Sequence, residues 1–147
     1  MVKNNPIITP MCEADLDDVV GIEERCFGSA NRADFLSCIS RSEVYSYYTL
    51  KVGNKVVGYY GIMHIADDGE LLTIAVDVDE QHKGYGEIMM RSVITNAGLK
   101  GSKKIFLEVN EHNEFAIKLY NKMGFKAISK RTKYYGEDDA IIMQLDL

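Results

Sequence analysis

The chain has 147 residues, 46% of them hydrophobic, and a formal net charge of -5 at pH 7 with a pI near 5.2. A chain of this size can bury one sizeable core but hardly two, so we expect a single domain over residues 1–147. The acidic balance argues against a nucleic-acid-binding surface. No apolar run approaches the roughly 18 residues of a membrane span, and the N-terminus lacks the apolar segment of a signal peptide. We therefore expect neither membrane insertion nor secretion.

The chain contains three cysteines, and neither their number nor their spacing suits a disulfide framework or a zinc site. This pattern indicates a reducing compartment, so we expect a cytoplasmic protein whose cysteines serve as small core residues. The three histidines fall in separate predicted elements, with no pair at ligand spacing. The sequence therefore predicts no metal site.

Taken in chain order, hydrophobic spacing predicts two helices and four strands in the first half. A strand near Ile7 and Ile8 precedes a helix over roughly Asp15–Cys26, where apolar residues recur at helical spacing. The next predicted elements are a helix near Arg32–Ser40 and strands at Tyr47–Val52, Val56–Ile65 and Leu71–Val78. Hairpin turns at Gly53-Asn54 and at Asp67-Asp68-Gly69 make these three strands an antiparallel meander.

The second half alternates helix and strand before a final hairpin. Its predicted elements are a helix over Gly84–Gly98, a strand over Ile105–Val109, a helix over Glu114–Met123 ended by Gly124, and strands at Ile128–Tyr134 and Ala140–Leu145. This order predicts an α+β fold in which helices flank one central sheet.

A glycine-containing turn, Gln81–Gly86, joins the apolar run Leu71–Val76 to the following helix. Glycines leave backbone N–H groups unshielded, and the helix adds its own unpaired N–H groups and the positive end of its dipole. Such a turn can bind a diphosphate, although by itself it also fits a plain connection between strand and helix. It reads G-x-G-x-x-M, which is not the dinucleotide-binding pattern, and no Gly-Lys-Ser/Thr follows for a nucleoside triphosphate.

Several segments together resemble the GNAT superfamily of N-acetyltransferases, and within it the RimI-type ribosomal-protein alanine N-acetyltransferases. The segments are Ile74–Asp77, Gln81–Gly86, Leu107–Val109 with Asn113, Ala116–Tyr120 followed by Met123–Phe125, and Tyr134-Tyr135 followed by Glu137–Met143. The resemblance covers nearly the whole chain. It implies the GNAT-like fold of acyl-CoA N-acyltransferases, with a mixed central sheet of about seven strands and about four helices.

The resemblance also implies a binding site for acetyl-CoA. Backbone groups of Ile74, Ala75 and Val76 would pair with the amide-containing pantetheine arm like an added strand. Asn113 would contact the cofactor further along. The pyrophosphate would bind the backbone amides of His82, Lys83, Gly84, Tyr85, Gly86 and Glu87. Glu87 departs from the basic or small polar residue usual in the family, and we expect its side chain to favour the helix N-terminus instead.

The chemistry needs a base and an acid, and the resemblance assigns these roles to Glu108 and Tyr120. An α-amine with a pKa near 7.7–8.0 is only about a tenth neutral at pH 7, so a base must take its proton. Glu108 ends a predicted strand of apolar neighbours, where partial desolvation would suit a base. Tyr120 would protonate the leaving thiolate, and the N–H of Val76 or of a neighbouring residue would stabilise the oxyanion. Read without the family, Glu108 fits a solvated or salt-bridged strand-end residue better than a base, and Tyr120 fits a core tyrosine beside Leu119 and Phe125 better than an acid.

The acceptor predicted from the resemblance is a protein N-terminus, with the alanine of ribosomal protein S18 as the candidate. Tyr134 and Tyr135 would hydrogen-bond the backbone of this substrate. The segment Phe27–Asn31 departs from the Phe-Pro-Trp-like pattern of the RimI type, so differences in the acceptor pocket are expected there. Two alternatives stay open: acetylation of a small amine such as a polyamine, an aminoglycoside or an amino acid, and a non-catalytic acyl-CoA-binding regulatory module.

Overall fold

In the computed structural model, residues 5–147 are described, and they form one seven-stranded sheet with four α-helices. The spatial order of the strands is β1-β2-β3-β4-β5-β7-β6. The strand bounds are β1 (Pro6–Pro10), β2 (Tyr45–Val52), β3 (Lys55–Ile65), β4 (Asp68–Val76), β5 (Lys104–Asn110), β6 (Lys126–Tyr135) and β7 (Asp138–Asp146). All neighbouring strands are antiparallel except β4 and β5, which run parallel, so the sheet is mixed as predicted.

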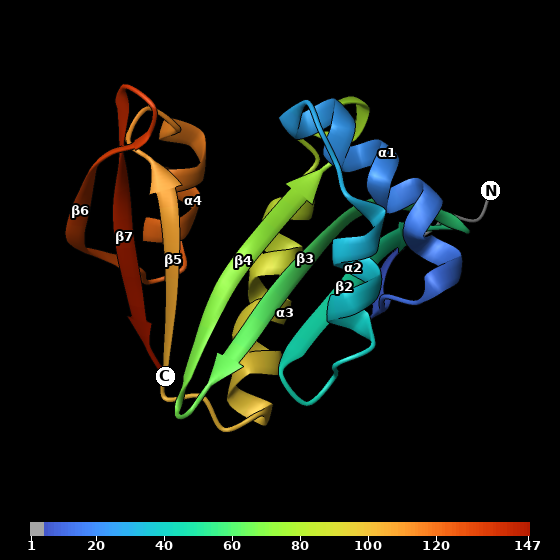
Figure 1. Ribbon diagram of the computed structural model, residues 1–147, viewed down its shortest axis with the longest axis horizontal. Helices are drawn as coiled ribbons and strands as arrows, with labels where there is room; N and C mark the ends of the chain where they lie inside the picture. The colour runs from blue at the N-terminus through green and yellow to red at the C-terminus, as the bar shows by residue number, and fades with distance from the viewer. Residues whose placement is uncertain (1–4) are drawn as a thin grey trace.

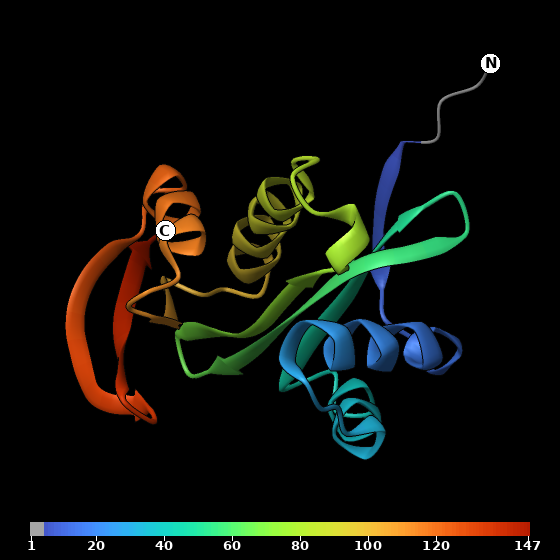
Figure 2. The ribbon, with the colours of Figure 1, turned by 90° about the horizontal axis from the view of Figure 1, so that it is seen from above.

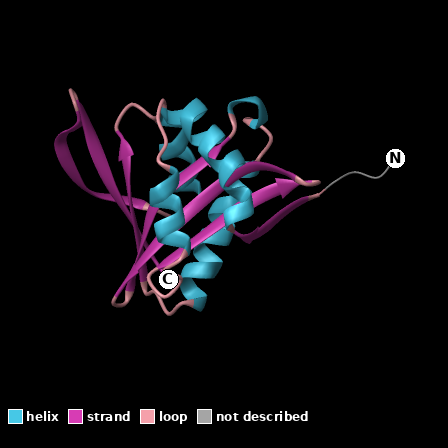
Figure 3. Ribbon diagram, turned by 45° about the vertical axis from the view of Figure 1, so that its right-hand side comes forward, coloured by secondary structure: helices cyan, strands magenta, loops and turns pink. Residues whose placement is uncertain are grey.

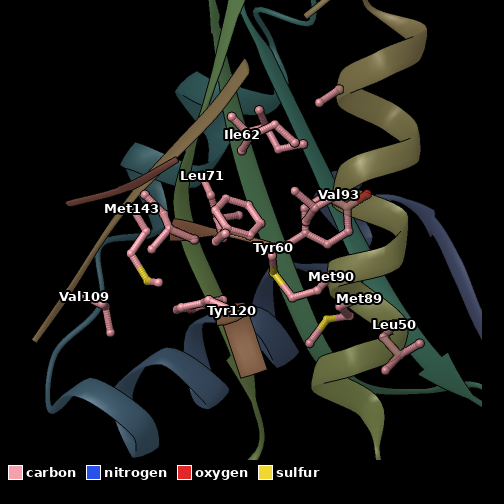
Figure 4. Close-up of a cluster of buried hydrophobic side chains, with 14 of the residues drawn as sticks. Leu50, Tyr60, Ile62, Leu71, Met89, Met90, Val93, Val109, Tyr120 and Met143 are labelled. Atoms are coloured by element: carbon pink, nitrogen blue, oxygen red, sulfur yellow. The ribbon is translucent and has the colours of Figure 1, made fainter. Parts of the chain in front are cut away.

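The helices cover both faces of the sheet (Figures 2 and 3). One face carries α1 (Leu16–Phe27) and α2 (Arg32–Ile39), whereas α3 (Tyr85–Leu99) and α4 (Glu114–Lys122) lie on the other. Each pair buries its own cluster of apolar side chains against the sheet. Figure 4 shows the larger cluster, in which Tyr120 of α4 lies among side chains from the sheet and from α3.

The sheet opens into a gap between β4 and β5, which diverge from a shared base (Figure 1). Within the described chain these two strands pair over Asp68–Glu70 and Lys104–Phe106. Just beyond this point Leu72 is an extra residue in the register between β4 and β3, because Thr73 faces Gly61 while Leu71 faces Ile62. A bulge bends its strand, so Leu72 lies where β4 turns away from β5. The gap separates β1–β4 from β5, β7 and β6.

The predicted element order is confirmed, whereas three details are corrected. The hairpin between β3 and β4 turns at Ala66-Asp67, and Gly69 lies within β4 opposite His64. Val78 begins a short 3-10 helix (Val78–Glu80) and is not the end of a strand. Glu108 lies inside β5 rather than at its end. None of the helices in residues 5–147 combines the length and the apolarity needed to cross a membrane.

Candidate active site

The predicted diphosphate cradle lies where β4 leads into α3, at the mouth of the gap (Figure 1). Gly84 is the N-cap of α3 and has a φ of +83°, a conformation that side chains disfavour. A Cβ at this position would meet no described atom within 4 Å, so the space in front of it is open. Because Gly84 has no side chain, it leaves the first N–H groups of α3 uncapped. These features fit the binding of a diphosphate.

Gly86 lies against α4, whereas Gly84 faces open space. A Cβ at Gly86 would stand 3.3 Å from a methyl carbon of Leu119 in α4. The absence of a side chain at this position therefore allows α3 and α4 to pack closely. A bulky replacement at Gly86 would press on α4, so Gly84 gives the cleaner test of the cradle.

Three residues of the turn that forms the cradle have charged or aromatic side chains. His82 has a φ of +65°, and its ring lies against Phe115 of α4. The Nζ of Lys83 is 2.8 Å from a carboxylate oxygen of Glu80, which partly neutralises its charge. Tyr85 is partly buried and packs against the larger core cluster. The backbone of this segment, rather than free positive charge, is thus what the turn offers to an anion.

Glu87 turns its carboxylate towards two cations. Its oxygens accept hydrogen bonds from Arg91 one turn along α3, at 3.0 Å, and from Lys122 of α4, at 3.2 Å. Lys122 and then Arg91 lower the pKa of this carboxyl below its ordinary value. The side chain therefore links α3 to α4, and its negative charge is paired with two cations.

The edge of β4 that faces the gap offers alternate backbone groups. The N–H of Asp77 donates to the carbonyl of Val57 at 2.8 Å, so Val76 and Gly58 form a pair without direct hydrogen bonds. The backbone groups of Val76, and by alternation those of Ile74, therefore point away from β3 and into the gap. Ala75, opposite Tyr59, directs its groups to β3. The prediction that all three residues offer backbone groups is thus corrected to Ile74 and Val76.

The two backbone groups of Val76 are in different situations. Its carbonyl accepts the side-chain N–H of Gln81 at 3.1 Å and the thiol of Cys26 at 3.3 Å. Its N–H is the group left to face the gap. Asn113, expected to contact the cofactor, is the N-cap of α4, where its side-chain oxygen accepts the N–H of Ala116 at 3.2 Å. The side-chain NH₂ group of Asn113 takes no part in this cap and can donate hydrogen bonds to a ligand.

Glu108 lies on the face of β5 that is turned away from α3 and α4. Its neighbours Leu107 and Val109 alternate with it and are buried in the larger core cluster. A nitrogen of Arg131 in β6 lies 3.2 Å from a Glu108 oxygen, and the Glu108 side chain is 20% exposed. Both side chains line a pocket of about 260 Å³ that also contains Asp68 and Glu70 of β4.

Sequence reasoning missed Arg131, although it extends the site. Its guanidinium carbon lies 5.3 Å from the ring centroid of Tyr134, whose ring in turn lies edge-on to Tyr135 at 5.0 Å. A continuous set of contacts therefore runs from Glu108 through Arg131 to both tyrosines. The available sequence signal was a lone arginine on the same strand as the tyrosine pair, which does not reveal a carboxylate partner on another strand.

Tyr120 and Tyr135 are perturbed by their surroundings. Burial, and to a lesser extent the neighbouring Tyr135, raises the pKa of Tyr120 to about 12. Burial, followed by the charge of Glu108, raises the pKa of Tyr135 above its ordinary value. Tyr135, in the outermost strand β6, is therefore near enough to Tyr120 and Glu108 for their charges to influence one another.

An irregularity in the last hairpin lies directly beside Tyr134 and Tyr135. The register between β6 and β7 shifts between Arg131 and Tyr135, and Lys133 has a φ of +53°. A side-chain oxygen of Asp139 accepts the N–H of Lys133 at 2.7 Å. Asp139 thereby holds the bulge, a role that the sequence did not reveal.

A second pocket, of about 160 Å³, lies between α1, α2 and β4 and reaches the bulge at Leu72. Glu23 and Asp34 line it. Glu23 accepts the hydroxyl of Tyr59 at 3.1 Å, and burial raises the pKa of this carboxyl. Across residues 5–147, no group of three or more histidine, cysteine and acidic side chains is arranged to hold a metal ion.

A gap whose one edge offers strand-like backbone groups, with an anion cradle at its mouth, suits an extended thioester that ends in a diphosphate. This arrangement defines the class as an acyltransferase that uses a CoA thioester. The model of the acetyltransferase (GNAT) family matches residues 12–125. The chain belongs to this family and is an acetyl-CoA-dependent N-acetyltransferase, as the sequence resemblance implied.

Relatives and solved structures agree with this family. The chain is 32% identical over 112 residues to the [ribosomal protein bS18]-alanine N-acetyltransferase of Escherichia coli K12, which covers 74% of this chain and 76% of the relative. The crystal structure of the Escherichia coli ribosomal-protein-S18-alanine N-acetyltransferase superposes with a TM-score of 0.87 at 29% identity, over 97% of this chain and 94% of that one. PaiA N-acetyltransferase from Thermoplasma acidophilum, solved with coenzyme A, shares the fold, with a TM-score of 0.83 at 19% identity over 97% and 99% of the two chains. The predicted GNAT fold is thus confirmed.

Proposed function

We propose that this enzyme acetylates the α-amine of a protein N-terminus, with the N-terminal alanine of ribosomal protein S18 as the candidate acceptor. The name of the Escherichia coli relative specifies that substrate. The observation that carries the proposal is the set of contacts from Glu108 through Arg131 and Tyr134 to Tyr135. It joins a carboxylate suited to take a proton from an amine to two phenols suited to bond peptide groups.

In the proposed reaction, acetyl-CoA supplies a thioester whose acetyl carbon is open to attack by an amine. The amide N–H groups around Gly84 hold the diphosphate, and backbone groups of Ile74 and Val76 align the pantetheine arm. The amide NH₂ of Asn113 contributes a further contact to the cofactor. Glu108 accepts the proton that the acceptor ammonium must lose before its nitrogen forms the new C–N bond.

Charge that develops on the acetyl oxygen is stabilised by the N–H of Val76, which faces the gap. As the C–S bond breaks, Tyr120 gives the departing sulfur a proton, and the proton that the newly bonded nitrogen loses restores the phenol. The pKa of about 12 keeps this phenol protonated throughout the neutral range. Tyr134 and Tyr135 bond the first peptide units of the acceptor and hold its amine towards Glu108.

The test compares a peptide that begins with alanine with spermidine, which has an amine but no peptide groups. Tyr135→Phe removes one hydrogen bond worth roughly 0.5–1.5 kcal/mol, so the KM for peptide should rise about two- to tenfold. The KM for acetyl-CoA should not change, and Tyr45→Phe on the distant strand β2 is the matched control. Robust turnover of spermidine by the parent enzyme, or equal losses with both acceptors, would replace this proposal with acetylation of a small amine.

A further inference from the structure

An exposed aromatic side chain stands beside the cradle without a role in the core. Phe115, the second residue of α4, is 67% exposed. Its ring centroid lies 5.6 Å from that of His82, with the two rings at 79°. His82 belongs to the turn that precedes Gly84, so this pair connects the start of α4 to the cradle.

Packing of α4 does not account for Phe115. The apolar residues that α4 packs against the larger core cluster are Ala116, Ile117, Leu119 and Tyr120. Phe115 is not part of this cluster, and because its ring is mostly exposed it adds little hydrophobic stabilisation. A flat apolar ring next to an anion site is instead suited to a ligand that combines a phosphate group with an aromatic ring.

We propose that Phe115, supported by His82, stacks on the adenine ring of acetyl-CoA. In this ligand the adenine is joined to the diphosphate through one ribose, so a diphosphate at the cradle leaves the base within reach of neighbouring side chains. A base has a π-face that stacks on an aromatic side chain. The inference rests on the proposed position of the diphosphate at Gly84, and it adds a binding residue for the part of the ligand that lies outside the gap.

The first test measures affinity by calorimetry with two ligands that share the pantetheine arm and a phosphate. Coenzyme A contains adenosine, whereas 4′-phosphopantetheine does not. Phe115→Ala should weaken coenzyme A about 5- to 100-fold, the range that corresponds to losing one stacked base, and should leave 4′-phosphopantetheine within about twofold. Leu99→Ala is the control, because it truncates an apolar side chain that is 80% exposed at the far end of α3.

A second test uses the absence of tryptophan from the chain. In Phe115→Trp the single indole can be excited alone, and the larger ring should keep or strengthen the affinity for coenzyme A. Stacking on adenine should quench this fluorescence when coenzyme A is added, whereas 4′-phosphopantetheine should leave it nearly unchanged. Equal quenching by both ligands would contradict contact with the base.

Failure of the adenine contact can be told apart from failure of the cradle. Asparagine tolerates the left-handed conformation, so Gly84→Asn adds a side chain in front of the cradle with little strain. It should weaken both ligands, and unchanged affinities would reject the cradle itself. If Gly84→Asn weakens both ligands while Phe115→Ala weakens neither, or both equally, the stacking proposal is wrong and the cradle stands.

Discussion

At the scale of single residues, the ion pair with Arg131 fixes the position of Glu108, the proposed base. One oxygen of the carboxylate lies 3.2 Å from the guanidinium, and a carboxylate has further lone pairs for an incoming amine. The 20% exposure of the Glu108 side chain leaves a route from the pocket to this group. The ion pair can therefore hold the base in position without closing access to it.

Replacing the base gives the first residue-scale prediction. Glu108→Gln keeps the size of the side chain but cannot accept a proton, so turnover at pH 7 should fall roughly 10²- to 10⁴-fold. The deficit should shrink above about pH 8, because the α-amine then loses its proton without help. Steady-state rates from pH 6 to 9.5 on an alanine peptide measure both effects, and the affinity for acetyl-CoA serves as the control. Full turnover at pH 7 would assign proton removal to another residue or to water.

At the scale of elements, one ion pair between a half-exposed arginine and a buried carboxylate ties α1 to the end of the strand that borders the gap. Asp77 follows β4 and receives two hydrogen bonds from Arg25 of α1, at 2.9 and 3.0 Å. The Asp77 side chain is 8% exposed, and Arg25 is the main cause of its lowered pKa. Because this pKa is lowered in the folded state, the stability from the pair is present above about pH 4 and is lost as pH falls through the folded pKa.

Removing the arginine tests this link between α1 and β4. Arg25→Gln removes the positive charge and the paired guanidinium donors from the buried carboxylate of Asp77. Hydrogen bonds to charged groups contribute about 1.5–3 kcal/mol to folding stability. For a domain of this size we expect the melting temperature at pH 7 to fall by roughly 4–8 °C. Arg32→Gln is the matched control, since Arg32 pairs with Asp17, whose side chain is 89% exposed, and such surface pairs contribute about 0–1 kcal/mol. Similar losses in the two variants would show that burial of Asp77 is unimportant.

At the scale of the whole molecule, the core on the α3 side contains ionisable phenols. Burial raises the pKa of both Tyr60 and Tyr120 to about 12. Tyr60 also shares a hydrogen bond of 2.7 Å with Ser92 of α3, whereas Tyr120 packs against Phe125. Since unfolded tyrosine has a pKa near 10, each protonated phenol contributes stability that is complete below pH 10 and is lost as pH rises towards 12.

This predicts an alkaline loss of stability with a defined origin. Between pH 9 and 11.5 each of the two phenols should cost roughly 2 kcal/mol of unfolding free energy, from about 1.4 kcal/mol per pKa unit. Urea unfolding of the parent and of Tyr120→Phe at both pH values measures the difference. The variant should lose about 2 kcal/mol less than the parent, and Tyr134→Phe, which changes a half-exposed tyrosine, should behave like the parent. Parallel curves for Tyr120→Phe and the parent would exclude this origin.

Local patterns in the sequence predicted most of the elements. The hydrophobic spacing located four helices and seven strands, and Gly84 and Gly124 were recognised near helix ends, where both have positive φ. Errors arose where two local signals competed. Glycine and aspartate favour turns, so Asp67-Asp68-Gly69 predicts a turn. In the structure Gly69 lies in β4, where its missing side chain makes room for Ser102, whose hydroxyl oxygen a Cβ would approach to 3.2 Å.

Chain sequence by itself determined the succession of elements, because this depends on residue type and local spacing. Its resemblance to the GNAT family supplied the family membership and the candidate residues Glu108, Tyr120, Tyr134 and Tyr135. Tertiary structure decided which distant groups meet: Arg131 with Glu108, and Phe115 with His82. It also decided that the backbone groups of Ile74 and Val76, but not those of Ala75, face the gap. The physical reason is that strand register and helix packing are set by burial summed over the whole sheet. No single segment contains the information that specifies its partner.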